Sequence, residues 1–254
     1  HRPDGEAHEE TADEDARQAG AQAGVEGEVA ALAERPAEHG DVEPGGQHGA
    51  EGDAGEGHVV LLRGEAGIGK TRTAAELLRM AAERGFACHR ALVLDFGAGK
   101  GQDAIGSLAR SLLGVVPGTG KEARASQIAA AIGAGLVDQS DLVYFNDLLD
   151  VAQPLELRAI SDAMSIATRQ QGREAALQTL LRRLAAQKPV MILVEDIHWA
   201  DPAVLSVLAA LARVANEAPV ILAMTTRIEG DPIDAEWRGQ AGGGALAIVD
   251  LGPL

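Results

Sequence analysis

Apolar residues cluster in short runs along most of the chain, and these runs alternate with segments of helical periodicity. The run at 58–63, HVVLLR, stops at a glycine and predicts a buried strand. Runs at 87–95, 189–194, 220–225 and 246–251 predict further strands. The pattern is therefore that of a sheet whose strands are joined by long connections.

Helical patterns fill these connections. Residues 71–84 have apolar positions at helical spacing, and Gly85 follows where that helix would end. Helices are also expected at 104–113 and at 201–216, where Asp201 is a typical N-cap. Strands separated by helices favour a parallel sheet covered on both faces, so the predicted fold class is a three-layer α/β/α fold.

A long segment rich in Ala and Leu lies before the third predicted strand. Residues 122–187 have helical periodicity that is interrupted at 133–135, at Pro154 and at Gly172. We expect several helices there, forming an insert at about 122–187 within a core domain at 58–254. Loops are expected at 97–101 and 117–121.

The first 57 residues have a different composition. They contain 16 acidic and 3 basic residues, so most of the chain's net charge of −16 lies there. They are almost free of Leu, Ile, Phe and Tyr, and a segment that buries so little apolar surface does not offset its ordering entropy. We expect residues 1–57 to be an acidic, disordered segment. Whether they are natural coding sequence stays open.

The overall composition narrows the class of protein. The 254 residues are 46% apolar but only 2% aromatic, so a sizeable core must consist of Leu, Val, Ile and Ala. No segment has the basic excess typical of nucleic-acid-binding surfaces. A single cysteine, Cys88, leaves no internal disulfide, and no apolar run is long enough to cross a bilayer. We expect a cytoplasmic protein that binds neither membranes nor nucleic acids directly.

The first candidate for a functional site is a glycine-rich motif at residues 64–71, GEAGIGKT, which matches G-x-x-x-x-G-K-[ST] at every defined position. Glycines let the backbone turn its N–H groups toward phosphate oxygens, and the following helix adds its positive N-terminal dipole. Lys70 can reach the β- and γ-phosphates, and the Thr71 hydroxyl can ligate magnesium. The alternative is a chance glycine-rich turn. The strand before the motif and the helix after it favour a site for ATP and Mg²⁺.

A second candidate lies at 190–196, VMILVED, where an apolar strand ends in two acids. In a parallel sheet this end lies beside the phosphate loop. A magnesium nucleotide site needs one carboxylate for the ion and another to orient or deprotonate water. In the usual pattern, the first acid after the apolar run faces the metal. This pattern assigns the metal to Glu195 and the catalytic role to Asp196, and the reverse assignment is left open. The alternative is a strand that ends in solvated acids.

The third candidate lies at the end of the fourth predicted strand. Thr225, Thr226 and Arg227 stand there, and an arginine can donate paired hydrogen bonds to a γ-phosphate. Arg227 is therefore a candidate catalytic residue, with a solvent-exposed arginine as the alternative. His198 and Trp199, which follow the acids, are expected to serve packing.

These elements together resemble the signal-transduction ATPases with numerous domains, a branch of the AAA-like P-loop ATPases. The sequence motifs GEAGIGKTR at 64–72 and LVEDIHWADP at 193–202 are similar to those of the ATPase modules of class III adenylate cyclases and of large LuxR-type transcription regulators. The resemblance runs from about residue 58 to the C-terminus. It implies a five-stranded parallel core in which one strand separates the phosphate-loop strand from the acid-bearing strand. It also implies a sensor role for Arg227 and a cofactor-binding loop made of Gly64, Glu65, Ala66, Gly67, Ile68, Gly69, Lys70, Thr71 and Arg72.

The sequence also departs from the family pattern. The Gly-Arg-Glu-type box that precedes the first strand in the family is reduced to GVEGEVAAL at 24–32, and we expect the C-terminal lid and the output domains to be missing. Three functions stay open: an ATP-hydrolysing switch that acts on partner domains of a signalling assembly, a binding-only module, and a P-loop phosphotransferase. The intact acid pair favours the switch, and a nucleotide-dependent oligomer is compatible with it.

Overall fold

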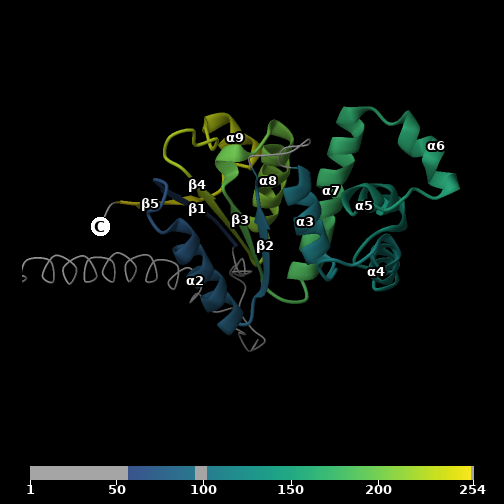
Figure 1. Cartoon of the computed structure of the whole chain (residues 1–254), viewed down its shortest axis with the longest axis horizontal. Coiled ribbons are helices and arrows are strands. Elements are labelled where there is room, and N and C mark those ends of the chain that lie inside the picture. Colours follow the sequence, from purple (N-terminus) through teal and green to yellow (C-terminus); the bar gives the residue numbers. More distant parts are fainter. Residues whose placement is uncertain (1–56, 95–101, 253–254) are drawn as a thin grey trace, which may run out of the picture.

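The structure, a computed structural model, describes residues 57–94 and 102–252 (Figure 1). The acidic segment at 1–56, the motif at 24–32 and the loop at 97–101 lie outside the described residues. The predictions made for them therefore stay predictions.

Five strands form one sheet at the centre of the described chain: β1 (His58–Gly64), β2 (Ala87–Leu92), β3 (Val190–Glu195), β4 (Val220–Thr226) and β5 (Leu246–Leu251). Their order across the sheet is β2-β3-β4-β1-β5. Every neighbouring pair is parallel, so each connection crosses over a face of the sheet. One strand, β4, separates β1 from the acid-bearing β3, as the family resemblance implied.

Helices connect the strands and complete the predicted three-layer α/β/α fold. They are α2 (Lys70–Glu83), α3 (Gln102–Leu112), α4 (Lys121–Gly133), α5 (Leu142–Leu148), α6 (Leu155–Ala163), α7 (Ile166–Ala185), α8 (Pro202–Ala215) and α9 (Ala235–Gln240). Short 3₁₀ helices lie at Gln139–Asp141 and Ile197–Trp199. α2 covers one face of the sheet, while α3, α7 and α8 cover the other.

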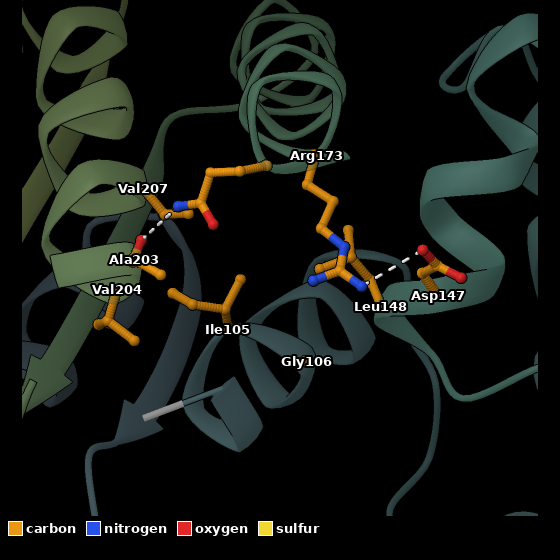
Figure 2. A pocket seen from close by; sticks show the side chains of 9 residues that line it. Ile105, Gly106, Asp147, Leu148, Arg173, Ala203, Val204 and Val207 are labelled. Carbon is orange, nitrogen blue, oxygen red and sulfur yellow. Dashed lines mark hydrogen bonds and ion pairs between the residues drawn. The ribbon is translucent and has the colours of Figure 1, made fainter. Parts of the chain in front are cut away.

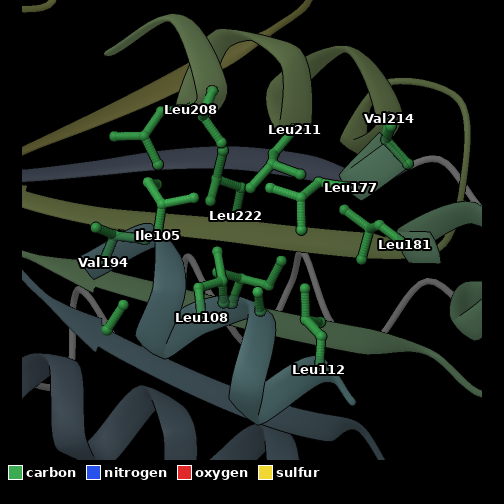
Figure 3. Close-up of a cluster of buried hydrophobic side chains, with 14 of the residues drawn as sticks. Ile105, Leu108, Leu112, Leu177, Leu181, Val194, Leu208, Leu211, Val214 and Leu222 are labelled. Carbon is green, nitrogen blue, oxygen red and sulfur yellow. The ribbon is translucent and has the colours of Figure 1, made fainter. Parts of the chain in front are cut away.

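Aliphatic side chains build both halves of the core. Beneath α2, Ala74, Leu77 and Ala81 pack against residues of β1, β3 and β4. On the opposite face, leucines and valines of α3, α7 and α8 interlock over β3 and β4 (Figure 3). This composition agrees with the low aromatic content of the sequence: among the buried residues of the described chain, only Phe145 and Trp237 carry large aromatic rings, so branched aliphatic chains fill most of the core.

Local signals set most element boundaries, and the predicted strands and the three named helices are confirmed to within three residues. α8 begins at Pro202 because the side chain of Asp201 accepts a hydrogen bond from the backbone N–H of Val204 at 2.9 Å. α2 ends before Gly85, whose φ of 87° is a left-handed conformation that glycine adopts without steric cost.

Two features differ from the sequence prediction. Gly172 does not interrupt a helix but lies inside α7. A Cβ on it would lie 2.1 Å from Cζ of Tyr144, so glycine serves the close approach of that ring. The sequence pattern does not predict α9, because six residues are too few to show helical periodicity. It is anchored by Trp237, which is 5% exposed and donates from Nε1 to the Leu205 carbonyl at 2.9 Å.

Four helices, α4 to α7, occupy the segment predicted as an insert. α7 packs into the central core, where Leu177, Leu180 and Leu181 are fully buried beside α8. α6, in contrast, lies at the far end of the molecule in Figure 1 and leaves Leu155 and Ile160 exposed. Within residues 57–94 and 102–252, none of the helices combines the length and apolarity that crossing a bilayer demands.

Replacing Leu177 with alanine is expected to lower the free energy of unfolding by about 2–5 kcal/mol, because the change removes buried apolar contacts and leaves a cavity. The control is Leu155→Ala, which removes the same atoms from a residue that is 80% exposed and is expected to cost less than about 0.5 kcal/mol. Urea denaturation, monitored by circular dichroism, measures the free energy of unfolding of both variants. Equal losses would contradict the placement of α7 in the cooperative core.

Candidate functional site

The phosphate-loop sequence lies between the end of β1 and the start of α2. Gly67 and Gly69 have φ values of 83° and 102°, a left-handed backbone that favours glycine. Apart from the nearest atoms of the chain itself, no atom lies within 4 Å of the position that a Cβ would take at either residue, so the backbone conformation and not crowding favours glycine there. Gly64 has a different role, since a Cβ there would lie 2.7 Å from Cγ2 of Ile68. This backbone fits a phosphate cradle at a helix N-terminus.

The Lys70 side chain folds back over this loop. Its Nζ donates to the carbonyl oxygens of Gly64 and Glu65, both at 2.7 Å, and the residue is 8% exposed. Burial lowers the pKa of the Lys70 ammonium, while the Asp196 carboxyl opposes this shift and the Arg227 guanidinium adds to it. Asp196 and Arg227 are therefore near enough to act on the charge of Lys70. The structure thus brings together one predicted residue from each of three separate segments.

The adjacent acids Glu195 and Asp196 have different environments. Glu195 is the last residue of β3 and is buried, and its carboxylate is ion-paired with the guanidinium of Arg90 on β2. The side chain of Asp196 is 41% exposed. β3 therefore does not end in two solvated acids. Sequence reasoning missed Arg90, although an arginine inside an apolar run was the available signal.

Asp196 has a backbone conformation that is rare outside glycine. Its φ of 58° and ψ of 43° place it in the left-handed region, which aspartate tolerates better than most residues. Its N–H donates to Oγ1 of Thr225 at 3.0 Å and so joins the end of β3 to β4. Strained residues of this kind are concentrated at functional sites, where surrounding contacts hold them.

The two threonines at the end of β4 lie on opposite faces of the sheet. Ala223 belongs to the apolar cluster beneath α2, and Met224 belongs to the cluster on the other face. Because side chains alternate along a strand, Thr225 shares the α2 face and Thr226 does not. Thr226 is fully buried on the face away from α2, so it is not a phosphate contact.

Arg227 follows β4 directly and is exposed. Its guanidinium carbon lies 5.4 Å from the centroid of the Trp199 ring, which is a cation–π contact. The Trp199 ring lies 4.8 Å from the ring of His198, whose Nδ1 is 4.0 Å from Oδ1 of Asp196. His198 and Trp199 therefore pack as predicted, and they form a path of contacts from Arg227 to Asp196.

An ion-pair network that the sequence did not indicate holds the residue before the loop. Arg63 donates from Nε and Nη2 to the Asp250 carboxylate at 2.7 and 2.8 Å, and from Nη1 to Asp231 at 3.3 Å. The guanidinium lowers the pKa of the Asp250 carboxyl below its usual range. This bidentate pair joins the ends of β1 and β5 at the base of the phosphate loop.

The residues present fit a magnesium nucleotide complex in their chemistry. Magnesium in such sites keeps several waters and takes one or two protein oxygens together with substrate phosphates. The exposed Thr71 hydroxyl at the start of α2 and the carboxylates at the end of β3 are oxygens of that kind. In the described part of the chain, no group of three or more His, Cys, Asp or Glu forms a metal site by itself.

Comparison with known families decides the class of this site. The sequence profile of the family described as AAA ATPase domain matches residues 50–223. The chain belongs to the AAA ATPase domain family. The matched residues include the phosphate loop and the acid pair, so the predicted P-loop ATPase class is confirmed and a nucleotide-binding module is supported. Arg227 lies just beyond the matched segment.

This AAA ATPase domain has relatives of uneven similarity. Uncharacterized protein R02095 of Rhizobium meliloti (strain 1021) is 33% identical over 208 residues, covering 78% of this chain and 19% of that protein. The chain thus spans about a fifth of that relative's length. Among solved structures, Drosophila ORC bound to AT-rich DNA and Cdc6 has a TM-score of 0.47 at 10% identity, covering 100% of this chain and 63% of the other. A DNA replication initiation factor has a TM-score of 0.32 at 10% identity, covering 77% and 40%. TM-scores and sequence identities this low say nothing about the function of this chain.

The AAA ATPase domain also has a cavity of about 90 Å³ where α5 and α7 meet α3 and α8 (Figure 2). On one side Arg173 pairs with Asp147 at 3.3 Å, and on the other Gln170 donates to the Ala203 carbonyl at 3.0 Å. None of the sequence-predicted site residues lines this cavity. It is therefore separate from the candidate phosphate site.

Proposed function

We propose that this AAA ATPase domain binds ATP with magnesium and hydrolyses it, and that its nucleotide state acts as a switch. The observation that carries the proposal is that the loop with Lys70, the acid Asp196 and Arg227 follow the carboxyl ends of β1, β3 and β4, which lie side by side in the parallel sheet. Ligands of parallel α/β sheets bind at these ends. A buried cation, a partly exposed carboxylate and an exposed guanidinium are the groups that phosphoryl transfer to water requires.

In this proposal, the phosphate loop binds the phosphate groups of the nucleotide. Backbone N–H groups at 64–71 and the N-terminus of α2 bind the phosphates, and Arg72 lies in the first turn of that helix. The Lys70 ammonium exchanges its two loop carbonyls for oxygens of the β- and γ-phosphates. Binding is thus a replacement of internal hydrogen bonds by stronger, charge-assisted bonds to phosphate.

The acids and the arginine supply the chemistry. Thr71 and Glu195 are the residues that would hold magnesium, which neutralises phosphate charge when bound. Asp196 orients the attacking water and accepts its proton. Arg227 donates to the γ-phosphate as negative charge develops on it.

The switch is the part of the proposal that rests on the family resemblance. The sequence motifs at 64–72 and 193–202 resemble those of ATPase modules in signalling and transcription-regulating proteins. The alignment covers 19% of the Rhizobium meliloti relative, so we place the output in partner domains or partner proteins. ATP-dependent association with these partners, or with further copies of the chain in the cytoplasm, would transmit the nucleotide state.

A binding-only module is the second candidate, because the ion pair with Arg90 occupies the Glu195 carboxylate. Calorimetric titration of the chain with Mg-ATP and a phosphate-release assay test both functions. Saturable binding with phosphate release is expected for the ATPase, and binding without release for the second candidate. If ATP does not bind, both are wrong.

ATP binding is expected to change the fluorescence of Trp199, because Arg227 leaves its ring to donate to the γ-phosphate. A cation–π contact at an exposed site is worth only about 0.5–1 kcal/mol, so phosphate can displace it. A Trp237→Phe background leaves Trp199 as the single tryptophan of the two in the chain. ADP, which lacks the γ-phosphate, should produce a smaller change. Adding Arg227→Ala should abolish the difference between ATP and ADP, and equal signals in the parent chain would contradict the sensor role.

A further inference from the structure

The ion pair between Arg90 and Glu195 joins a fixed anion to a cation that can leave. Glu195 lies on an interior strand and its side chain is 3% exposed. Arg90 lies on β2, an edge strand, and its side chain is 54% exposed. The carboxylate is therefore held in place by the sheet, while the guanidinium can move into solvent without disturbing the core.

The strand register places this pair on the side of the sheet that carries the phosphate loop. Arg90 is opposite Leu193, and Leu92 is opposite Glu195. Leu193 belongs to the cluster beneath α2, and residues two apart on a strand share a face. Arg90 therefore reaches along β2 toward the carboxyl end of β3, on the face where α2 and the loop lie.

We propose that Arg90 is a positioning residue that holds Glu195 in the metal-free domain and competes with the divalent cation for this carboxylate. The inference rests on the proposed function, in which Glu195 faces magnesium. A buried carboxylate requires a counter-charge, and Arg90 supplies it before metal binds. Two cations at one carboxylate repel each other, so Arg90 moves into solvent when the metal is bound. Arg90 thus raises the magnesium concentration that the domain needs.

A purely structural tie between β2 and β3 is the competing explanation. The backbone ladder from Ala87 and Val190 to Leu92 and Glu195 already joins these strands. Arg90 adds to this ladder the counter-charge of a buried carboxylate, so loss of the pair is expected to lower the unfolding temperature under either explanation, and the affinity for divalent cations distinguishes the two. If the pair were only a tie, its removal would change the unfolding temperature and leave the affinity for divalent cations unchanged.

The experiment compares the native chain with Arg90→Gln, Arg90→Lys and the control Arg79→Gln. Arg79 has the same side-chain exposure of 54% but pairs with Glu76 and Glu83 on α2. Two quantities are measured for each chain. One is the affinity for Mn²⁺ without nucleotide, by electron paramagnetic resonance. The other is the Mg²⁺ concentration that gives half of the maximal thermal stabilisation at saturating ADP.

Arg90→Gln is expected to bind Mn²⁺ about three- to tenfold more tightly and to need correspondingly less Mg²⁺, the size expected for removing one partly exposed ion pair. Arg90→Lys should lie between Arg90→Gln and the native chain, because lysine keeps the charge but lacks the planar fork. It also keeps the test decisive if the glutamine variant does not fold. Arg79→Gln should match the native chain.

Equal or weaker cation affinity in Arg90→Gln would overturn the competition. Absence of Mn²⁺ binding in every chain would overturn it as well, because Glu195 would then not be a metal ligand. A third outcome is tighter Mn²⁺ binding in Arg90→Gln together with no ADP or ATP binding in any chain. That result would refute the proposed nucleotide function while leaving the competition at Glu195 standing.

Discussion

Replacing Lys70 with alanine is expected to weaken ATP binding by about ten- to a hundredfold. The ammonium is the buried cation of the phosphate loop, and a hydrogen bond from a charged group is worth about 1.5–3 kcal/mol. The same change frees the carbonyl oxygens of Gly64 and Glu65, which accept hydrogen bonds from the Lys70 ammonium in the structure. Calorimetric titration with Mg-ATP measures the loss of affinity, and thermal unfolding shows whether the variant remains folded.

Lys188→Ala is the matched control for this prediction. It removes the same charge from an exposed residue just before β3, and ATP affinity should not change. A Lys70→Ala chain that binds ATP as tightly as the native chain would show that the loop is not the phosphate site. That conclusion would hold however phosphate release behaves in the variant.

Replacing Asp196 with asparagine is expected to lower phosphate release by about 10²–10⁴-fold while ATP affinity changes by only a few-fold. Asparagine has nearly the same shape, but its amide does not accept a proton, and general-base catalysis contributes about that factor. The backbone bond to Thr225 needs no carboxylate and is retained. Asparagine also tolerates the left-handed backbone at this position. The loss should therefore appear in turnover and not in folding.

Asp201→Asn is the control for this second prediction. Asp201 lies five residues further on and caps α8, and asparagine caps a helix as well as aspartate does. Its phosphate release and its unfolding temperature should match those of the native chain. If Asp196→Asn releases phosphate at the native rate, its role as the base is wrong. Glu195, the other acid of the pair, would then become the candidate for activating water.

Three charged side chains of the candidate site have partners within the chain. Lys70 is bonded to loop carbonyls, Glu195 is paired with Arg90, and Arg227 rests on Trp199. ATP and magnesium would displace internal partners in all three places. Every displacement has a cost in lost hydrogen bonds or ion pairs, and these costs couple nucleotide binding to a change in side-chain arrangement. Such coupling is what a switch requires.

The sequence by itself determined the phosphate loop, because everything the loop needs is encoded in neighbouring residues. A strand, two glycines in the left-handed region and a helix that begins at Lys70 follow one another within a few positions. The α/β alternation and the Asp201 cap are also local signals, and the structure reproduces them. Local rules suffice wherever the interacting groups are close along the chain.

Only the tertiary structure decided which groups meet across the sheet. Arg90 and Glu195 are 105 residues apart, and the ion pair depends on the register of β2 against β3. The exclusion of Thr226 depends on which face of β4 is turned toward α2. The glycine inside α7 is explained by a ring on another helix. A sequence pattern records the period of a strand or helix, whereas the partner of a side chain is fixed only when distant segments pack.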